Sequence, residues 1–388
     1  MAGGFGFPRA AAVAYPRAMR LWLVLGCVAA CGGGGGDFLS DDHIVVDGFD
    51  STITDCRAGI CQHNENTDLT VFGGATYLVH RTAKSQILGP NSSLRISRSD
   101  DHGKTWNLLA VLPAINGRDL RDPCFYVIDG KLAIKALTRL PMSSFRDTGV
   151  DTIAVGSIYD GTNWSPLAPI GPETWSYWRI RDDAAGVHYS AAYEDGDKSV
   201  ALFSSVDGTN WTRGAEIYGH AEDTPLETEL VFMPSGKLLA LVRMDGTDAE
   251  LLGNVGRLRT KVCWASPPYT AWDCSRELDG VRLDGPVAFL HGSRLFVIAR
   301  KHFIEPADRK RTALYELTGD FNGGDLQIIE HGELPSAGDT SYAGVAPIDR
   351  DRVLVTWYSS SLMFDDPWST AIFAASDIWQ ATLDLSRL

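Results

Sequence analysis

The sequence predicts an all-β fold, a six-bladed β-propeller of four-stranded antiparallel blades. A β-hairpin pattern returns six times along the chain, and the turn glycines of the first five copies lie 56, 56, 50 and 56 residues apart. This spacing is typical of one propeller blade per repeat. The content of 44% hydrophobic and 10% aromatic residues, with 39 glycines, is too apolar for disorder. The six copies span residues 71–81, 124–135, 177–193, 230–243, 286–300 and 342–358.

Each repeat buries little surface alone and must stack on its neighbours, so we expect the six to form one domain over residues 37–388. The net charge of −14 argues against a nucleic-acid or anionic-membrane footprint, because both need a basic excess. We therefore expect no nucleic-acid partner, and we expect a monomer. Any basic site must be local.

Residues 1–36 differ from the repeats and indicate an export leader followed by a glycine tether. Three arginines precede the apolar run 21–30, which is too short to span a bilayer, and Cys31 and five glycines follow. Residues 28–31 resemble a bacterial lipobox, which would make Cys31 the lipidated residue and anchor the protein in the outer leaflet. An ordinary secretory signal is the alternative. Both interpretations predict an exported protein of the cell envelope or the medium.

Export favours disulfides, and the cysteine spacing suggests two. Cys56 with Cys61, and Cys263 with Cys274, are close enough in sequence to form local bridges. Cys124 is then left over. We expect it to be a buried free thiol on an inner strand and not a nucleophile, since no general base lies near it in sequence.

Short turn motifs of the Ser-x-Asp-x-Gly-x-Thr-Trp type lie between the hairpins. In these Asp-boxes the aspartate accepts backbone amide bonds, the glycine takes positive φ and the tryptophan packs between blades. We interpret Asp101 and Asp207 as turn formers and not as metal ligands. The motifs occupy residues 99–106, 157–164 and 205–211, with a degenerate copy at 266–272.

Asp-boxes spaced around six hairpins resemble the sialidase superfamily of six-bladed propellers, over residues 45–388. The resemblance implies an arginine triad that binds a sugar carboxylate, a tyrosine nucleophile paired with a glutamate, and an aspartate that acts as acid and base. Arginine forks suit a carboxylate because they form bidentate, charge-assisted bonds. By position in the hairpins, Arg81, Arg243 and Arg300 are similar to the three triad arginines.

The same resemblance places the nucleophile at Tyr342, with Glu227 or Glu229 as its base. A neutral phenol avoids the repulsion that a carboxylate nucleophile would meet beside an anionic substrate. The acid/base aspartate has no counterpart, because residues 82–95 contain no carboxylate. We expect Asp122 to replace it, and His80 is the second choice.

Three further residues are expected at the substrate. Arg121 belongs to the run 118–123, whose alternating charges could instead form an interblade salt bridge. Trp178 and Arg179 open the third hairpin, where the aromatic ring could stack on a sugar or pack in the core. No zinc cluster, phosphate-binding glycine loop or nucleophile elbow is recognisable, so no metal or organic cofactor is implied.

These features predict a surface-anchored or secreted exo-glycoside hydrolase that removes a terminal acidic sugar and retains configuration through a tyrosyl intermediate. Two alternatives stay open. One is another glycan-processing enzyme, such as a lyase on uronic-acid polysaccharide in which His80 or Tyr342 abstracts a proton. The other is a glycan-binding propeller without catalysis.

Overall fold

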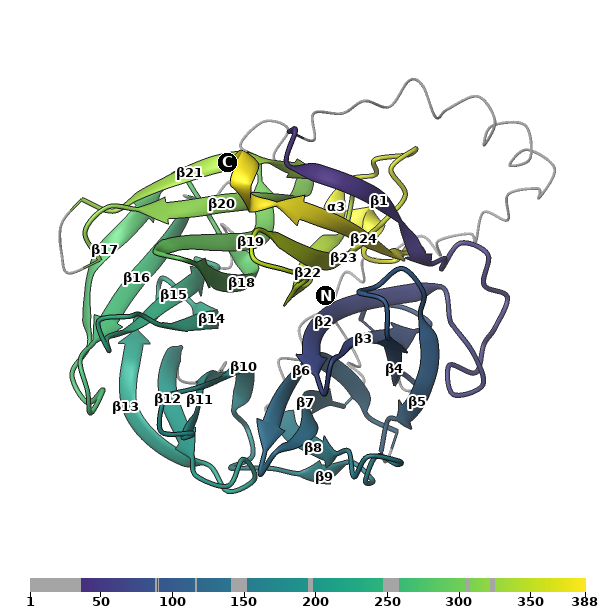
Figure 1. Cartoon of the computed structure of the whole chain (residues 1–388), viewed down its shortest axis with the longest axis horizontal. Coiled ribbons are helices and arrows are strands. Elements are labelled where there is room, and N and C mark those ends of the chain that lie inside the picture. The colour runs from purple at the N-terminus through teal and green to yellow at the C-terminus, as the bar shows by residue number, and fades with distance from the viewer. Residues whose placement is uncertain are drawn as a thin grey trace, which may run out of the picture. The chain divides into compact units, whose positions relative to one another are not determined.

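A computed structural model describes residues 36–388 except 88, 90, 116, 141–151, 195–197, 247–257, 304–307 and 322–324. Six four-stranded antiparallel sheets form a ring around a central axis (Figure 1). The predicted fold class is confirmed. The leader, including Cys31, lies outside the described residues apart from Gly36. No described helix has the length and apolarity needed to cross a membrane.

The first three blades follow the chain from the innermost strand outward. They comprise β2 (His63–Phe72), β3 (Ala75–Ala83), β4 (Ser93–Ser99) and β5 (Asn107–Pro113); β6 (Asp119–Ile128), β7 (Lys131–Arg139), β8 (Thr152–Ile158) and β9 (Ala168–Pro169); and β10 (Ser176–Asp182), β11 (His188–Glu194), β12 (Ser199–Ser205) and β13 (Thr212–Gly219).

The next two blades repeat this order, and the sixth closes the ring. They comprise β14 (Pro225–Phe232), β15 (Leu238–Met244), β16 (Arg259–Ala265) and β17 (Asp273–Asp279); β18 (Asp284–His291), β19 (Arg294–His302), β20 (Lys310–Thr318) and β21 (Gln327–Leu334); and β22 (Thr340–Pro347), β23 (Arg352–Ser359) and β24 (Asp377–Asp384), with the N-terminal strand β1 (Leu39–Val46) outermost.

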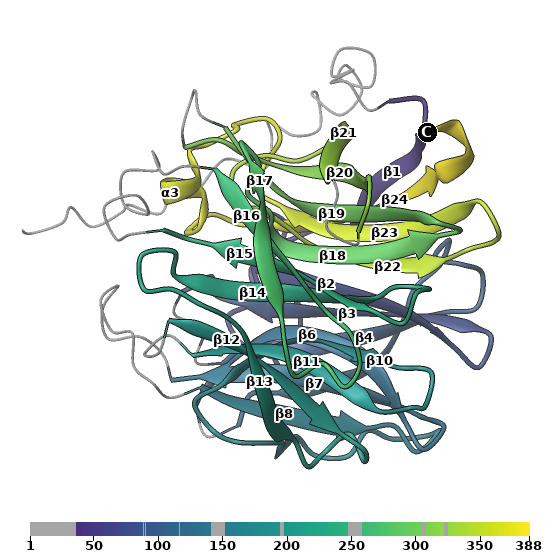
Figure 2. The same ribbon diagram turned by 90° about the vertical axis from the view of Figure 1, so that its left-hand side faces the viewer.

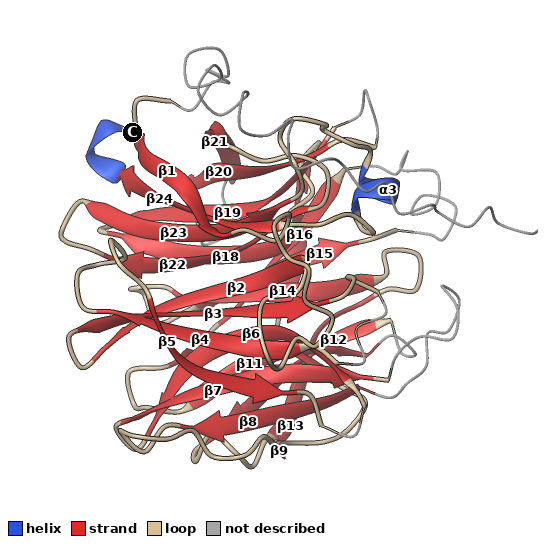
Figure 3. Ribbon diagram, turned by 90° about the vertical axis from the view of Figure 1, so that its right-hand side faces the viewer, coloured by secondary structure: helices blue, strands red, loops and turns tan. Residues whose placement is uncertain are grey.

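The pairing of β1 with β24 joins the two ends of the propeller chain, and Figure 1 shows β1 beside β24. This closure replaces one hairpin connection by a contact between the first and last strands, which ties the ring together. The view in Figure 2 shows the strands crossing the thickness of the ring, with turns at both edges. Within the described residues, two short helices, α3 (Trp368–Ala371) and η2 (Leu385–Arg387), interrupt the otherwise all-β pattern (Figure 3).

The hydrophobic core lies between neighbouring blades, not inside single ones. Val79 of the first blade and Ile134 of the second belong to one fully buried cluster, and Val297 of the fifth blade packs with strands of the fourth in another. Because a sheet must bury an apolar face against another element, each blade covers the next around the ring. The stacking therefore fixes where the inner strands lie relative to one another.

Both expected disulfides are present, between Cys56 and Cys61 and between Cys263 and Cys274. Cys124 is free and buried, as predicted. Burial in apolar surroundings raises the pKa of its thiol, so it has little thiolate character.

The Asp-boxes form the turns that the sequence predicts. Asp101 accepts hydrogen bonds from the Thr105 backbone N–H at 2.9 Å and from the Thr105 hydroxyl at 2.7 Å. Hydrogen bonds from Ser99 and Thr105 lower the pKa of Asp101 to about 2. The Trp106 indole of the same box donates to Gln380 of the sixth blade at 2.8 Å. The box thus links neighbouring blades.

Candidate functional site

Each of the six inner strands is interrupted near its N-terminal end by a β-bulge, and these bulges build the site. A bulge leaves residues out of the ladder and turns their side chains in a new direction, which is why bulges are frequent beside active sites. Because the strands are equivalent repeats, the bulges lie at the same end of the ring axis. The residues left unpaired are Asn66 and Thr67, Asp122 and Pro123, Trp178 and Arg179, Leu226 and Glu227, Gly285 and Pro286, and Tyr342 and Ala343.

Several bulge residues have a left-handed backbone, which non-glycine residues seldom adopt. φ is 52° at Asn66, 46° at Asp122 and 50° at Tyr342. Gly285 has φ of 56°, and a Cβ atom there would lie 2.8 Å from Cδ2 of Tyr342. Only glycine therefore leaves room for the Tyr342 ring. Such strain persists only where the surrounding structure holds it, as at many functional sites.

Bulge residues from four blades line a small pocket. The sequence-predicted residues Asp122, Trp178, Arg179 and Tyr342 are all in its wall. The complete lining is Asn66, Thr67, Asp122, Pro123, Lys135, Trp178, Arg179 and Tyr342. The pocket brings one carboxylate, one phenol and two cations together.

Tyr342 and Glu227 form the pair that the sequence predicts. The Tyr342 hydroxyl donates to Oε1 of Glu227 at 2.6 Å, and Nη1 of Arg243 donates to Oε2 of Glu227 at 2.7 Å and to the Tyr342 oxygen at 3.2 Å. Burial raises the pKa of Glu227, and burial together with the Glu227 charge raises the pKa of Tyr342. The phenol therefore keeps its proton at rest, with a carboxylate in place to take it.

The Tyr342 ring is held by two neighbouring side chains. Trp178 meets it edge to face, with ring centroids 5.8 Å apart, and the Trp178 indole is fixed by a 3.1 Å bond to the Pro286 carbonyl. The Arg300 guanidinium lies over the ring at 5.1 Å from its centroid, within cation–π range. These contacts leave the phenol little freedom to turn away from Glu227.

The three predicted triad arginines do not form one open carboxylate site. Arg243 and Arg300 both reach Tyr342, but each already pairs with internal carboxylates: Arg243 with Glu227, and Arg300 with Asp339 at 2.9 Å. None of the three lines the pocket. The expectation that Arg81 binds a substrate carboxylate is wrong, because its guanidinium is buried and paired with internal carboxylates.

Arg81 is fully buried between the first and second blades. Its Nη1 donates to Glu65 at 2.6 Å, and its Nε and Nη2 donate to Asp119 at 2.8–3.0 Å. Arg121 also contacts Asp119, at 3.0 Å, and lies 4.0 Å from Glu65. Asp119 and Arg121 therefore form the interblade salt bridge that was the alternative interpretation of the run 118–123.

Of the two glutamates proposed as base, only Glu227 contacts Tyr342. Glu229 is buried against Arg181 and the Ala288 backbone N–H, in a separate ion pair. Asp122 lines the pocket and accepts a 2.6 Å bond from the Asn66 amide. The alternative, His80, is buried in the first blade, where burial lowers its pKa to about 4, and it does not line the pocket.

Arg179 and Lys135 supply the positive charge of the pocket wall. Arg179 pairs with Asp68 and donates to the Ala343 carbonyl. The Lys135 ammonium donates to the carbonyls of Asp122 at 3.0 Å and of Tyr177 at 2.7 Å. Both cations therefore also anchor the bulges that present Asp122 and Tyr342.

The acidic partners of Arg243 and Arg282 were not predicted from the sequence. Asp245 and Asp284 both contact Arg243, at 2.6 and 3.1 Å, and both also contact Arg282. A signal was available, because Arg243 and Arg282 each precede an aspartate by two residues. In extended backbone, residues two apart point to the same side, so the spacing indicates pairing within the protein.

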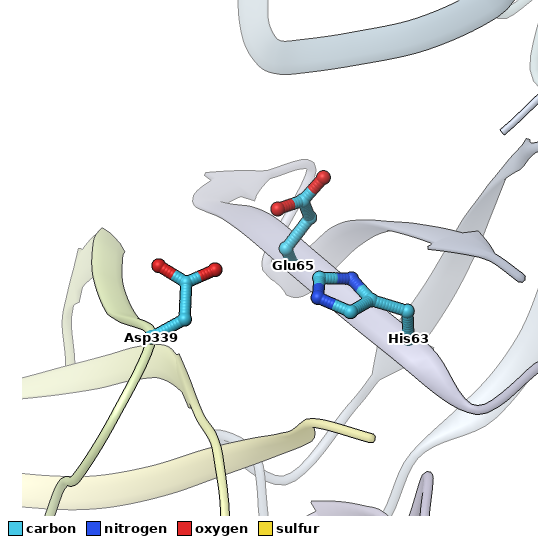
Figure 4. A group of neighbouring side chains, drawn as sticks. All are labelled: His63, Glu65 and Asp339. Atoms are coloured by element: carbon cyan, nitrogen blue, oxygen red, sulfur yellow. The ribbon is translucent and has the colours of Figure 1, made fainter. Parts of the chain in front are cut away.

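Three buried side chains that could bind a metal, His63, Glu65 and Asp339, lie close to one another (Figure 4). Donor atoms of His63, Glu65 and Asp339 all lie within 4.8 Å of one another. The two carboxylates are already neutralised by Arg81 and Arg300. A divalent cation would add two uncompensated charges to a buried place, which is costly. We assign no ion to it.

Comparisons with known proteins agree with this architecture at low sequence identity. No protein-family model matches the chain, and no curated protein matches it. A Dyadobacter fermentans protein of unknown function is 15% identical with a TM-score of 0.64, and the match covers 90% of this chain and all of that one.

Sialidases of known structure are also similar. The Hadza microbial sialidase Hz136 is 14% identical (TM-score 0.58), over 84% of this chain and 66% of that chain, and Trypanosoma rangeli sialidase is 14% identical (TM-score 0.57), over 83% and 55%. NanB sialidase from Streptococcus pneumoniae is 11% identical (TM-score 0.61), over 84% and 69%. This chain thus spans little more than half of the trypanosomal enzyme. It shares the six-bladed β-propeller fold of these sialidases.

Proposed function

We propose that the protein is a retaining exo-glycoside hydrolase of sialidase-like type. The observation that carries the proposal is the hydrogen-bonded set of Tyr342, Glu227 and Arg243 at the pocket. A phenol acts as a nucleophile only when a base takes its proton, and Glu227 lies 2.6 Å from the phenol oxygen.

In the proposed first step, the Tyr342 oxygen attacks the anomeric carbon while its proton passes to Glu227. The bond to the leaving group breaks, and Asp122 protonates the departing oxygen. In the second step, Asp122 takes a proton from water, the water oxygen attacks the anomeric carbon, and the Tyr342 oxygen leaves and regains its proton from Glu227. Arg243 stabilises the negative charge that develops on the phenol oxygen.

We propose a terminal acidic sugar as the substrate. Arg179 and Lys135 place positive charge in the pocket wall, and Nη1 of Arg243 lies 3.2 Å from the Tyr342 oxygen, so the site favours a sugar that carries a carboxylate. The two disulfides support export, where such glycans are met.

A second candidate, glycan binding without turnover, is favoured by the ion pairs at the site. Arg243 and Arg300 are both engaged with internal carboxylates, so substrate would have to compete for them. Such a protein would bind acidic glycans and leave them intact.

Hydrolysis of 4-methylumbelliferyl sialoside by the full chain tests the proposal. We expect turnover by the wild type and no turnover by Tyr342→Phe. The control is Tyr189→Phe, which removes a tyrosine hydroxyl from the third blade outside the pocket lining and should keep its activity. Binding on a glycan array without turnover would instead establish the second candidate. An unsaturated product from a uronic-acid polysaccharide would show elimination in place of hydrolysis.

A further inference from the structure

A line of hydrogen-bonded side chains crosses the fifth blade from its third strand to the ring axis. Nζ of Lys310 on β20 lies 2.8 Å from Nδ1 of His302, and Nε2 of His302 on β19 lies 2.8 Å from Oδ2 of Asp284 on β18. His302 and Lys310 are direct cross-strand partners. All three side chains are almost fully enclosed.

The line continues into the site through Arg243. The other oxygen of Asp284, Oδ1, lies 3.1 Å from Nε of Arg243, whose Nη1 donates to Glu227 and to the Tyr342 oxygen. Asp284 is thus held on one side by His302 and on the other contacts the arginine beside the phenol. Arg282 also donates to both oxygens of Asp284, at 2.7 and 3.0 Å.

The bonding pattern determines the tautomer of His302. Burial lowers the pKa of His302 to about 3, so the ring is neutral and has one N–H and one lone pair. The ionised Asp284 can only accept, which places the N–H on Nε2 and leaves Nδ1 to accept from the Lys310 ammonium. Every polar atom of the imidazole therefore has a complementary partner.

We propose that His302 and Lys310 are positioning residues of the site: they orient Asp284, and through it they hold Arg243 against the Tyr342 oxygen. This inference rests on the proposed function, because the held arginine matters most when charge develops on the phenol oxygen. Neither residue lines the pocket, so neither is expected to touch substrate. Their effect should appear in the chemical step.

Kinetics of His302→Leu compared with His302→Gln test the inference. Leucine removes the donor to Asp284, whereas the glutamine amide can replace the Nε2–H. We expect kcat to fall about 10- to 100-fold in His302→Leu, with little change in KM, since small displacements of a positioned group cost up to about 10²-fold. Lys310→Met should lower kcat less, and His302→Gln should recover part of the loss.

His188→Leu is the matched control, because His188 also pairs with an aspartate, Asp182, at 2.6 Å, but in the third blade. It should leave kcat unchanged. A loss of kcat that His302→Gln does not recover, or an equal loss in His188→Leu, would overturn the positioning role and indicate a general effect on folding.

A measurement without substrate separates this inference from the proposed function. In protein labelled with ¹³Cζ-tyrosine, the Tyr342 resonance is assigned by its absence in Tyr342→Phe. We expect this resonance to shift in His302→Leu and to stay in place in His188→Leu. An unchanged resonance in folded His302→Leu overturns the inference. A shifted resonance in a protein that cleaves no glycoside supports the inference while the hydrolase proposal fails.

Discussion

Replacing Arg81 tests whether this arginine serves the fold or the substrate. Arg81→Met removes the guanidinium but keeps most of the apolar stem, and it leaves the buried Glu65 and Asp119 without their main partner. Breaking a buried ion pair from one side costs about 3–5 kcal/mol. Arg121 still reaches Asp119 at 3.0 Å and lies 4.0 Å from Glu65, so we expect about 3 kcal/mol.

The loss of unfolding free energy in Arg81→Met should depend on pH because Glu65 titrates. Burial raises the pKa of Glu65 to about 7 from 4.5, so its contribution to stability is fully present below pH 4.5 and is lost as the pH rises through about 7. Without Arg81, which lowers that pKa, the charged form is still less favourable. The penalty of Arg81→Met should therefore be largest above pH 7 and shrink in acid.

Urea unfolding followed by tryptophan fluorescence measures both effects. The control is Arg98→Met, which breaks an exposed pair with Asp100 in the same blade and should cost less than about 1 kcal/mol. If Arg81→Met lost under 1 kcal/mol while glycan binding or turnover fell more than tenfold, the reasoning would be refuted. Arg81 would then be the substrate ligand that the resemblance implies.

Three further outcomes follow from the same structure. Burial raises the pKa of Asp377 from 3.8 to about 7, so the contribution of this residue to stability is lost as the pH rises through about 7. Asp377→Asn should therefore reduce the fall in unfolding free energy between pH 4 and pH 7. An unchanged pH dependence of the unfolding free energy, measured by urea titration, would contradict this. Glu227→Gln should lower kcat about 10²- to 10⁴-fold in the fluorogenic assay because the amide cannot take the phenol proton, whereas retained activity would remove Glu227 as the base. Asp101→Ala should cost about 1 kcal/mol in urea unfolding by freeing the Thr105 donors. Turnover by Asp101→Ala should not change. A loss of turnover without a loss of stability would show that Asp101 has a role beyond forming its turn.

The blades were predictable because each repeat carries its own local signals: alternating strands, a turn glycine and an Asp-box. The ring closure was not predicted. The strand Leu39–Val46 is exposed along most of its length, so it has no alternating apolar pattern to mark it as part of a blade. Its partner β24 lies at the other end of the chain, and pairing at that distance leaves no local trace in the sequence.

The contact between Tyr342 and Glu227 was predictable for a different reason. Tyr342 and Glu227 occupy equivalent places at the starts of inner strands, and a propeller brings such places to one channel. The role of Arg81 could not be judged in this way. Arg81 lies near the end of β3, the second strand of its hairpin. Whether its side chain reaches the pocket depends on the bulge after Glu65 and on Asp119 from the next blade. Neither feature can be seen in the residues around Arg81.

The most direct measurement is covalent trapping with a 2,3-difluorosialosyl donor followed by peptide mass spectrometry. We predict one added glycosyl group on the peptide that contains Tyr342, with slower labelling in Glu227→Gln and no labelling in Tyr342→Phe. A glycosyl group on another residue, or undiminished sialoside turnover by Tyr342→Phe, would contradict the account.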